Sequence, residues 1–163
     1  MRLRNLCRSD APLMLEWMHD PSVVANLQAN FSSKTIENCL SFIVAAENTE
    51  TNLHMAIVDD GDTYMGTVSL KNIHEGMAEF AITVRAAAMG KGYARYGMRE
   101  MLEYGVTQRM LERIYWCVSP ENHRAVRFYD KNGYVRTTEV PDSLRQGYSR
   151  ELIWYVYSSE SIV

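Results

Sequence analysis

The sequence predicts a single mixed α/β domain over residues 1–163. Two observations point to this fold class: apolar residues recur at the spacing of amphipathic helices in some segments and alternate at the spacing of strands in others. No internal repeat, low-complexity tract or linker separates these segments, so we place no domain boundary. A chain of 163 residues is long enough to bury one sizeable core.

The N-terminal part is expected to form a short strand and two helices. Residues 1–6 (MRLRNL) form the strand, and Asp10 caps a helix with Pro12 in its first turn. This helix stops at the segment DPSV, because the residue before a proline leaves the helical region. A second helix begins at Ser32 or Ser33. Each helix has an apolar stripe, formed by Leu13, Met14, Trp17 and Met18 in the first and by Ile36, Leu40, Ile43 and Val44 in the second.

Three strands in a meander are expected next. Residues 53–70 (LHMAIVDDGDTYMGTVSL) contain two strands joined at Asp59–Asp62, where acidic residues and a glycine supply the turn. A metal site formed by Asp59, Asp60 and Asp62 is the alternative, and a solvated hairpin tip is favoured over it. The third strand, residues 76–84 (GMAEFAITV), alternates so that Glu79 lies on the face opposite to Phe80 and Ile82.

The C-terminal half alternates helices and strands. A long helix follows the segment around residue 90, residues 113–118 (RIYWCV) form a strand, and residues 119–135 (SPENHRAVRFYDKNGYV) contain a helix. Asn132 and Gly133 end that helix as a C-terminal cap. Residues 150–157 (RELIWYVY) form the last strand. The apolar stripe of the long helix consists of Ala94, Met98, Met101, Leu102, Gly105 and Val106.

Composition excludes several classes of partner. The net charge of −3 and the lack of any basic run argue against nucleic acid. No apolar stretch approaches the length of a membrane span, and the first ten residues lack the apolar core of a signal peptide. Cys7, Cys39 and Cys117 show no metal spacing, so we expect free thiols, no resident metal and a cytoplasmic location.

Residues 86–98 (AAAMGKGYARYGM) form the most unusual segment. They connect a strand to a helix, where N–H groups that the helix cannot pair point outward and the helix dipole favours negative charge. An anion site is therefore predicted, with phosphate as its commonest occupant. A P-loop is excluded because Gly92 follows Lys91, and the dinucleotide fingerprint is excluded because Arg95 occupies its third glycine position. A tight turn without any ligand explains this segment equally well by itself.

A second motif lies one helix and one strand further on. Asn122 stands where a helix needs a cap, and Ala125, Tyr129 and Gly133 follow at intervals of three or four residues. With both motifs in order, the chain resembles the GNAT superfamily of acetyl-CoA-dependent N-acetyltransferases. The family motif Asn-x-x-Ala-x-x-x-Tyr-x-x-x-Gly-aromatic is matched in full, with Tyr134 as the aromatic residue. The resemblance covers nearly the whole chain and is strongest to ribosomal-protein alanine, diamine and amino-sugar acetyltransferases.

The resemblance implies a fold and a cofactor. The GNAT fold has a central, mostly antiparallel twisted sheet that is splayed at the cofactor site and has helices on both faces. The family's pyrophosphate loop reads Gln/Arg-x-x-Gly-x-Gly/Ala; Gly92 and Ala94 match its last two fixed positions, whereas Met89 departs from the first. The residues implied to bind acetyl-CoA are Ile82, Thr83, Val84, Met89, Gly90, Lys91, Gly92, Tyr93, Ala94, Asn122 and Ala125.

Two residues are implied to be catalytic. Tyr129 resembles the family's general acid, which protonates the leaving thiolate, although a role in the core is the alternative. Glu79 resembles a carboxylate that takes the amine's proton in some family members. The alternative, of nearly equal weight, is that Glu79 is only a strand residue paired with a basic neighbour. Glu151 could instead bind a cationic end of the substrate. His54 and His74 form no metal site or triad by their spacing.

The resemblance implies acetyl transfer from acetyl-CoA to a primary amine by direct attack on the thioester. The acceptor is a small amine, an amino-sugar or a protein N-terminus, bound between residues 20–35 and 139–149. A non-catalytic acyl-CoA-binding regulatory module is the alternative, which Met89 favours and Tyr129 and Asn122 disfavour. A homodimer is kept as an option.

Overall fold

The computed structural model describes residues 1–27 and 29–161. These residues form a seven-stranded sheet in the order β1-β2-β3-β4-β5-β7-β6, antiparallel except for the pair of β4 and β5. The strands are β1 (Arg2–Asn5), β2 (Leu53–Val58), β3 (Tyr64–His74), β4 (Met77–Val84), β5 (Arg113–Val118), β6 (Val135–Thr137) and β7 (Ile153–Ser158). The helices are α1 (Ala11–Met18), α2 (Pro21–Val24), α3 (Ile36–Ala45), α4 (Tyr93–Gln108), α5 (His123–Lys131) and α6 (Asp142–Arg145).

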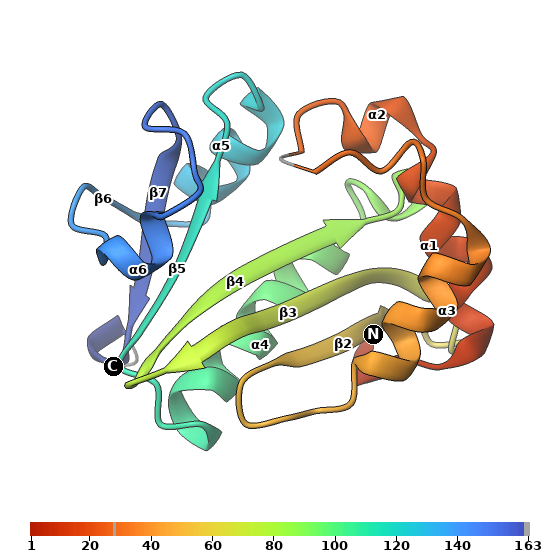
Figure 1. Cartoon of the computed structure of the whole chain (residues 1–163), viewed down its shortest axis with the longest axis horizontal. Helices are drawn as coiled ribbons and strands as arrows, with labels where there is room; N and C mark the ends of the chain where they lie inside the picture. The colour runs from red at the N-terminus through yellow and green to blue at the C-terminus, as the bar shows by residue number, and fades with distance from the viewer. Residues whose placement is uncertain (28, 162–163) are drawn as a thin grey trace.

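Helices cover both faces of the sheet, as the fold class requires (Figure 1). On one face, α4 and α5 enclose a core with β2 to β5, in which Met98 and Leu102 of α4 meet Phe80 and Trp116 of the strands. On the other face, α1 and α3 pack against β2 and β3, and Trp17 of α1 donates a hydrogen bond to the hydroxyl of the buried Tyr64. The predicted mixed α/β class is confirmed.

The sheet opens between β4 and β5. The two strands pair only from Met77 to Glu79, against Arg113 to Tyr115, and then diverge (Figure 1). The Arg85 N–H donates to the Met65 carbonyl, 2.8 Å away, and the antiparallel register with β3 continues from there. The backbone N–H and C=O groups of the odd-numbered residues in β4 therefore point toward β3, and those of the even-numbered residues point away from it. The N–H groups of Ile82 and Val84 thus point into the opening between β4 and β5.

The N-terminal helices differ from the sequence prediction at their ends. Asp10 precedes α1, but its carboxylate accepts hydrogen bonds from Arg4 and from the Cys7 N–H rather than capping the helix. The segment DPSV does not only end α1: Asp20 caps the short helix α2, which the sequence prediction missed. Helix α3 begins after Thr35, not at Ser32 or Ser33, because Thr35 and Asn38 form a capping box. Val44 is 61% exposed and does not belong to the apolar stripe.

The predicted hairpin between β2 and β3 is present, and its acidic residues have local partners. The Asp59 carboxylate accepts hydrogen bonds from the N–H groups of Gly61 and Thr63. Asp60 pairs with the N-terminal ammonium group, and Asp62 pairs with two arginines of β1. The turn therefore has the solvated form that the sequence favours. In residues 1–27 and 29–161, no helix combines the length and apolar content of a membrane span.

Candidate active site

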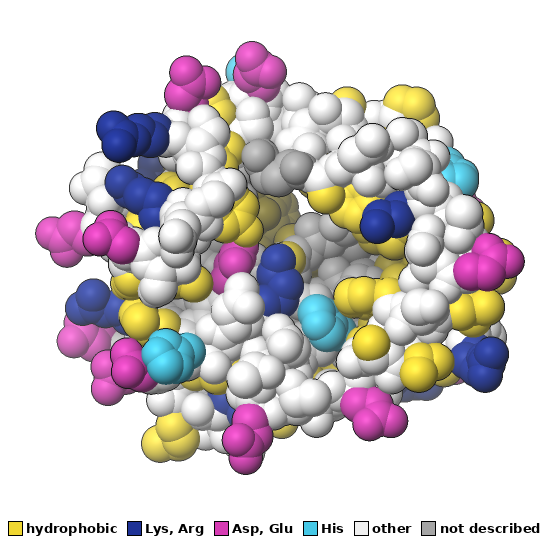
Figure 2. Space-filling model, viewed as in Figure 1, with side chains coloured by type: hydrophobic (Ala, Val, Ile, Leu, Met, Phe, Trp, Pro, Cys, Tyr) yellow, Lys and Arg dark blue, Asp and Glu magenta, His cyan; other side chains and the backbone are white. Residues whose placement is uncertain are grey.

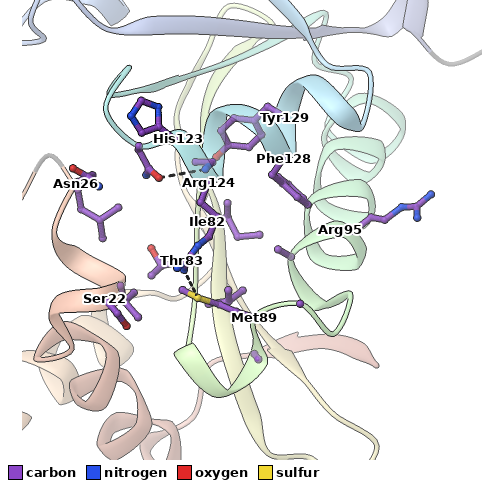
Figure 3. A pocket seen from close by; sticks show the side chains of 18 of the residues that line it. Ser22, Asn26, Ile82, Thr83, Met89, Arg95, His123, Arg124, Phe128 and Tyr129 are labelled. Atoms are coloured by element: carbon purple, nitrogen blue, oxygen red, sulfur yellow. Dashed lines mark hydrogen bonds between the residues drawn. The ribbon is translucent and has the colours of Figure 1, made fainter.

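A cavity of about 710 Å³ lies at the opening between β4 and β5 (Figure 3). It is walled by the outer half of β4, the loop before α4, the first turns of α4 and α5, and helix α2. The structure brings together most residues that the sequence predicts for the cofactor and the acid. These are Ile82, Thr83, Val84, Met89, Gly90, Gly92, Ala94, Asn122, Ala125 and Tyr129. Lys91 is exposed and Tyr93 packs on the core, and neither is part of the lining.

The glycine-containing loop presents bare backbone to the cavity. Gly90 and Gly92 have φ angles of 74° and 87°, which a residue with a Cβ rarely adopts. Gly92 stands at the N-cap of α4, and no side chain caps that helix. The N–H groups of the first turn of α4 thus remain available to an anion. This geometry agrees with the anion site predicted from the sequence.

Two arginines belong to this end of the cavity; Arg124 points toward the loop, whereas the side chain of Arg95 extends away from it (Figure 3). Arg95 of α4 and Arg124 of α5 belong to the lining, and neither forms an ion pair with any described residue. The described lining contains no aspartate or glutamate. Arg124 reaches across from α5, and its Nη1 atom contacts the Met89 sulfur (Figure 3). Arg124 is one of several lining residues that the sequence analysis missed; its place in the first turn of α5, beside Asn122, was the available signal.

Tyr129 combines a packed ring with a hydroxyl at the cavity. Its ring contacts those of Trp116 and Tyr155, with centroids 5.7 and 5.0 Å away. The side chain lines the cavity, and its hydroxyl makes no hydrogen bond with a described residue (Figure 3). Burial raises the pKa of Tyr129 well above the ordinary value of a tyrosine, so its proton is retained at neutral pH. Both interpretations of Tyr129 from the sequence are therefore compatible with its position.

Asn122 begins α5 in the way the sequence predicts. Its Oδ1 atom accepts a hydrogen bond from the Ala125 N–H at 3.3 Å, which caps the helix. The side chain also belongs to the cavity lining, so capping does not exclude contact with a ligand.

Glu79 lies outside this cavity. It is 6% exposed, and its carboxylate accepts a hydrogen bond from the Tyr148 hydroxyl. Asn72 Nδ2 is 3.5 Å from its Oε2 atom, and Lys71 Nζ is 3.9 Å from its Oε1 atom. The charge of Glu79 also acts on Cys117: burial, and to a smaller extent the negative charge of Glu79, raise the pKa of the Cys117 thiol to about 12. Phe80, the next residue along β4, packs on Trp116 in the core on the other face of the sheet. Glu79 therefore lies on the face opposite to Phe80 and Ile82, as the alternation along the strand predicts.

The remaining polar candidates lie elsewhere. Glu151 is exposed in the turn before β7, and His74 is exposed beside Glu75. His54 shares a hydrogen bond of 2.7 Å with the Ser69 hydroxyl on the face that carries Glu79. The described residues contain no group of three or more His, Cys, Asp or Glu side chains that could hold a metal ion.

Comparison with known families identifies the class of protein. Residues 1–135 match the model of the acetyltransferase (GNAT) domain, and the chain belongs to this family. The resemblance recognised from the two motifs is therefore confirmed.

Individual relatives agree with this assignment. Spermidine N(1)-acetyltransferase of Vibrio cholerae is 37% identical over 68 residues, which cover 42% of this chain and 39% of that protein. The chain thus spans about two fifths of that curated relative. An uncharacterized N-acetyltransferase of Bacillus licheniformis, p20, is 25% identical over 150 residues, covering 85% of this chain and 84% of the relative.

Solved structures show the same fold. The crystal structure of the Vibrio cholerae spermidine N-acetyltransferase in complex with CoA and spermine superposes with a TM-score of 0.81. The match covers 98% of this chain and 96% of that one at 20% identity. The expected GNAT fold is confirmed.

Replacing Gly92 with valine should block the approach of a phosphate to the loop. Gly133→Val is the matched control, because Gly133 also has a positive φ, 79°, but lies outside the cavity lining. We expect the Kd for CoA, measured by calorimetry, to rise more than about tenfold for Gly92→Val only. Equal affinities in the two folded variants would show that the loop holds no phosphate.

Proposed function

We propose that this protein transfers the acetyl group of acetyl-CoA to a primary amine. One observation carries the proposal: the free edge of β4 faces the hydroxyl of Tyr129 across a cavity whose far end holds bare helix N–H groups and Arg124, which forms no ion pair with a described residue. A long, mostly neutral thioester arm fits the strand edge, and its phosphates fit the positive end. The solved relative with bound CoA and the curated acetyltransferases support this assignment.

The open strand edge would position and polarise the thioester. The N–H groups of Ile82 and Val84 point into the opening, where the amides of a pantetheine arm can pair as an additional strand does. One of these N–H groups can donate to the thioester oxygen, which gains negative charge as the amine attacks. The phosphates would contact the loop from Gly90 to Ala94, with Arg124 supplying the positive charge that Met89 lacks.

The reaction requires two proton transfers. The neutral amine nitrogen forms a bond to the thioester carbon, and the carbon–sulfur bond then breaks to release a thiolate. Tyr129 would donate its proton to that thiolate, since its pKa is raised by burial and the proton is present. The amine's own proton would leave through water to Glu79, which lies on the opposite face of β4 and not in contact with Tyr129.

Release of free CoA thiol in the presence of a panel of amines tests the function directly. We expect thiol release that depends on the amine, and a product whose mass has increased by one acetyl group. Tight binding of acetyl-CoA without transfer to any amine would instead favour the non-catalytic regulatory module. We also predict that the protein is cytoplasmic and forms a homodimer. Cys7, Cys39 and Cys117 are free thiols in the structure.

Tyr129→Phe tests the general acid. The substitution keeps the ring and its packing but removes the proton, so kcat should fall by about 10²- to 10⁴-fold with little change in CoA affinity. Tyr134→Phe is the control, because Tyr134 also packs on Trp116 but is not part of the lining. Wild-type turnover in Tyr129→Phe, with chemistry rate-limiting, would assign Tyr129 to the core alone.

Arg124→Gln tests the phosphate contact. Loss of one charge-assisted hydrogen bond should raise the Kd for CoA by about ten- to a hundredfold, and the effect should shrink at high salt. Arg127→Gln, on the same helix but outside the lining, should leave the Kd unchanged. Acetyl transfer from S-acetyl-N-acetylcysteamine, which has no phosphate, should not respond to either change. An equal loss with this short thioester would contradict a phosphate role.

Glu79→Gln tests the base. The amide keeps the shape of the side chain and removes its charge, so the rise of kcat with pH should weaken or shift to higher pH, where more amine is neutral in solution. A rate–pH profile of wild-type form and height would mean that water or another group accepts the proton, and that Glu79 serves as the partner of Lys71 and Tyr148.

A further inference from the structure

The face of the sheet opposite to Tyr129 carries a strip of mostly polar residues. Pairing in register places Thr67, Ser69 and Lys71 of β3 beside Thr83, Ala81 and Glu79 of β4. We call these six residues the polar strip. It lies between the core under α1 and α3 and the cluster around Tyr115, Leu144 and Trp154, to which Tyr148 belongs.

The polar strip leads into the cofactor cavity. Thr83, at one end, lines that cavity, whereas Lys71 and Glu79 form the other end. Figure 2 shows this face of the molecule, with a hollow near its middle and a basic, an acidic and a histidine side chain beside it. An acceptor lying on the strip would therefore extend from the thioester toward Lys71 and Glu79.

Lys71 has hydrogen-bonding capacity that the protein does not use. Its Nζ atom makes no hydrogen bond with a described residue; its one charged partner there is Glu79, at 3.9 Å. Its side chain remains 35% exposed. Glu79, by contrast, already accepts from Tyr148 and lies near Asn72. The ammonium group of Lys71 can therefore donate to an anion while Glu79 keeps its other partners.

His54 lies beside Lys71 on the same face. Its Nδ1 atom is hydrogen-bonded with Ser69, which leaves the second ring nitrogen for another partner. Burial, and then the positive charge of Lys71, lower the pKa of His54, so the ring is neutral at pH 7. Because Lys71 is already positively charged, this part of the surface disfavours another positive charge and suits a negatively charged group of a ligand.

The polar strip is poorly suited to a polycation. Its single carboxylate, Glu79, is already balanced by Lys71. The stretch from residue 21 to residue 35, part of which walls the cavity, contains no aspartate or glutamate and includes Lys34. A spermidine or spermine molecule would need several carboxylates to replace the water around its ammonium groups.

We propose that the acceptor is a small zwitterion, an amine with a carboxylate a few bonds away, as in a free amino acid. The carboxylate would bind Lys71 and His54, and the amine would lie near Ala81, within reach of Glu79 through water. Residues two apart on a strand are about 7 Å apart, which is close to the extended length between an amine and a carboxylate separated by three or four carbons. The long side chain of Lys71 can bend toward Ala81, so a shorter amino acid can also reach both groups. This inference rests on the proposed function and specifies its acceptor.

Matched acceptors test the inference. The protein L-amino acids, β-alanine and 4-aminobutyrate are compared with their carboxamides, with an acidic peptide and with spermidine, using thiol release and product mass. We expect at least one free amino acid to exceed its carboxamide by about ten- to a hundredfold in kcat/KM, the equivalent of one charge-assisted hydrogen bond. Faster transfer to spermidine, to the carboxamides or to the peptide would overturn this inference and leave the proposed function intact; transfer to none would overturn both.

Variants of Lys71 separate recognition from structure. Lys71→Met should lower kcat/KM for the amino acid by about ten- to a hundredfold more than for the carboxamide, because both acceptors lose the neighbour of Glu79 but only the amino acid also loses the partner of its carboxylate. Lys71→Arg should recover most of the loss, and Lys131→Met, on the exposed end of α5, should change neither. Equal losses with amino acid and carboxamide would mean that Lys71 acts only by holding Glu79, which contradicts the inference.

Discussion

The parting of β4 from β5 after three paired residues is the constraint on which the site depends. Beyond Glu79 the two strands are no longer paired, so the N–H groups of Ile82 and Val84 at the edge of β4 have no partner strand among the described residues. Unpaired backbone groups bind another polar chain or water. The aromatic cluster of Phe80, Trp116, Tyr129 and Tyr155 packs where the strands part and brings α5 to the opening. The cavity and its acid candidate thus have a common structural origin.

The sheet separates the site into two chemically different regions. On one side, Arg124 and helix N–H groups make a positive end suited to phosphates, with Tyr129 nearby. On the other side, Lys71, Glu79 and His54 form a nearly neutral polar surface. A cofactor held along the edge of β4 would meet an acceptor from the opposite face. This division explains why the acid and base candidates do not contact each other.

Local sequence motifs predicted the parts of the site that local geometry determines. The glycine loop needs positive φ angles at Gly90 and Gly92, and Asn122 must cap α5, so both features are visible in short stretches of sequence. The alternation along β4 likewise placed Glu79 on the correct face.

Features that depend on contacts between distant segments could not be predicted in this way. Arg124 meets Met89 only because α5 lies over the loop before α4, and Tyr148 reaches Glu79 from 69 residues away. The short helix α2 has only four residues, too few for a periodic pattern. The start of α3 was misplaced because Ser32, Ser33 and Thr35 are all acceptable caps by residue type, and the side chain of Asn38 decides among them.

Amide hydrogen exchange along β4 would test the central claim most directly. At saturating CoA, the exchange of the Ile82 and Val84 amides should slow markedly, because a pantetheine arm paired with the open edge shields them. The Thr83 amide, which the register turns toward β3, should change little. Slower exchange in residues 90–94 with no change at Ile82 and Val84 would contradict the account, since CoA would then bind by its phosphates without occupying the opening between the strands.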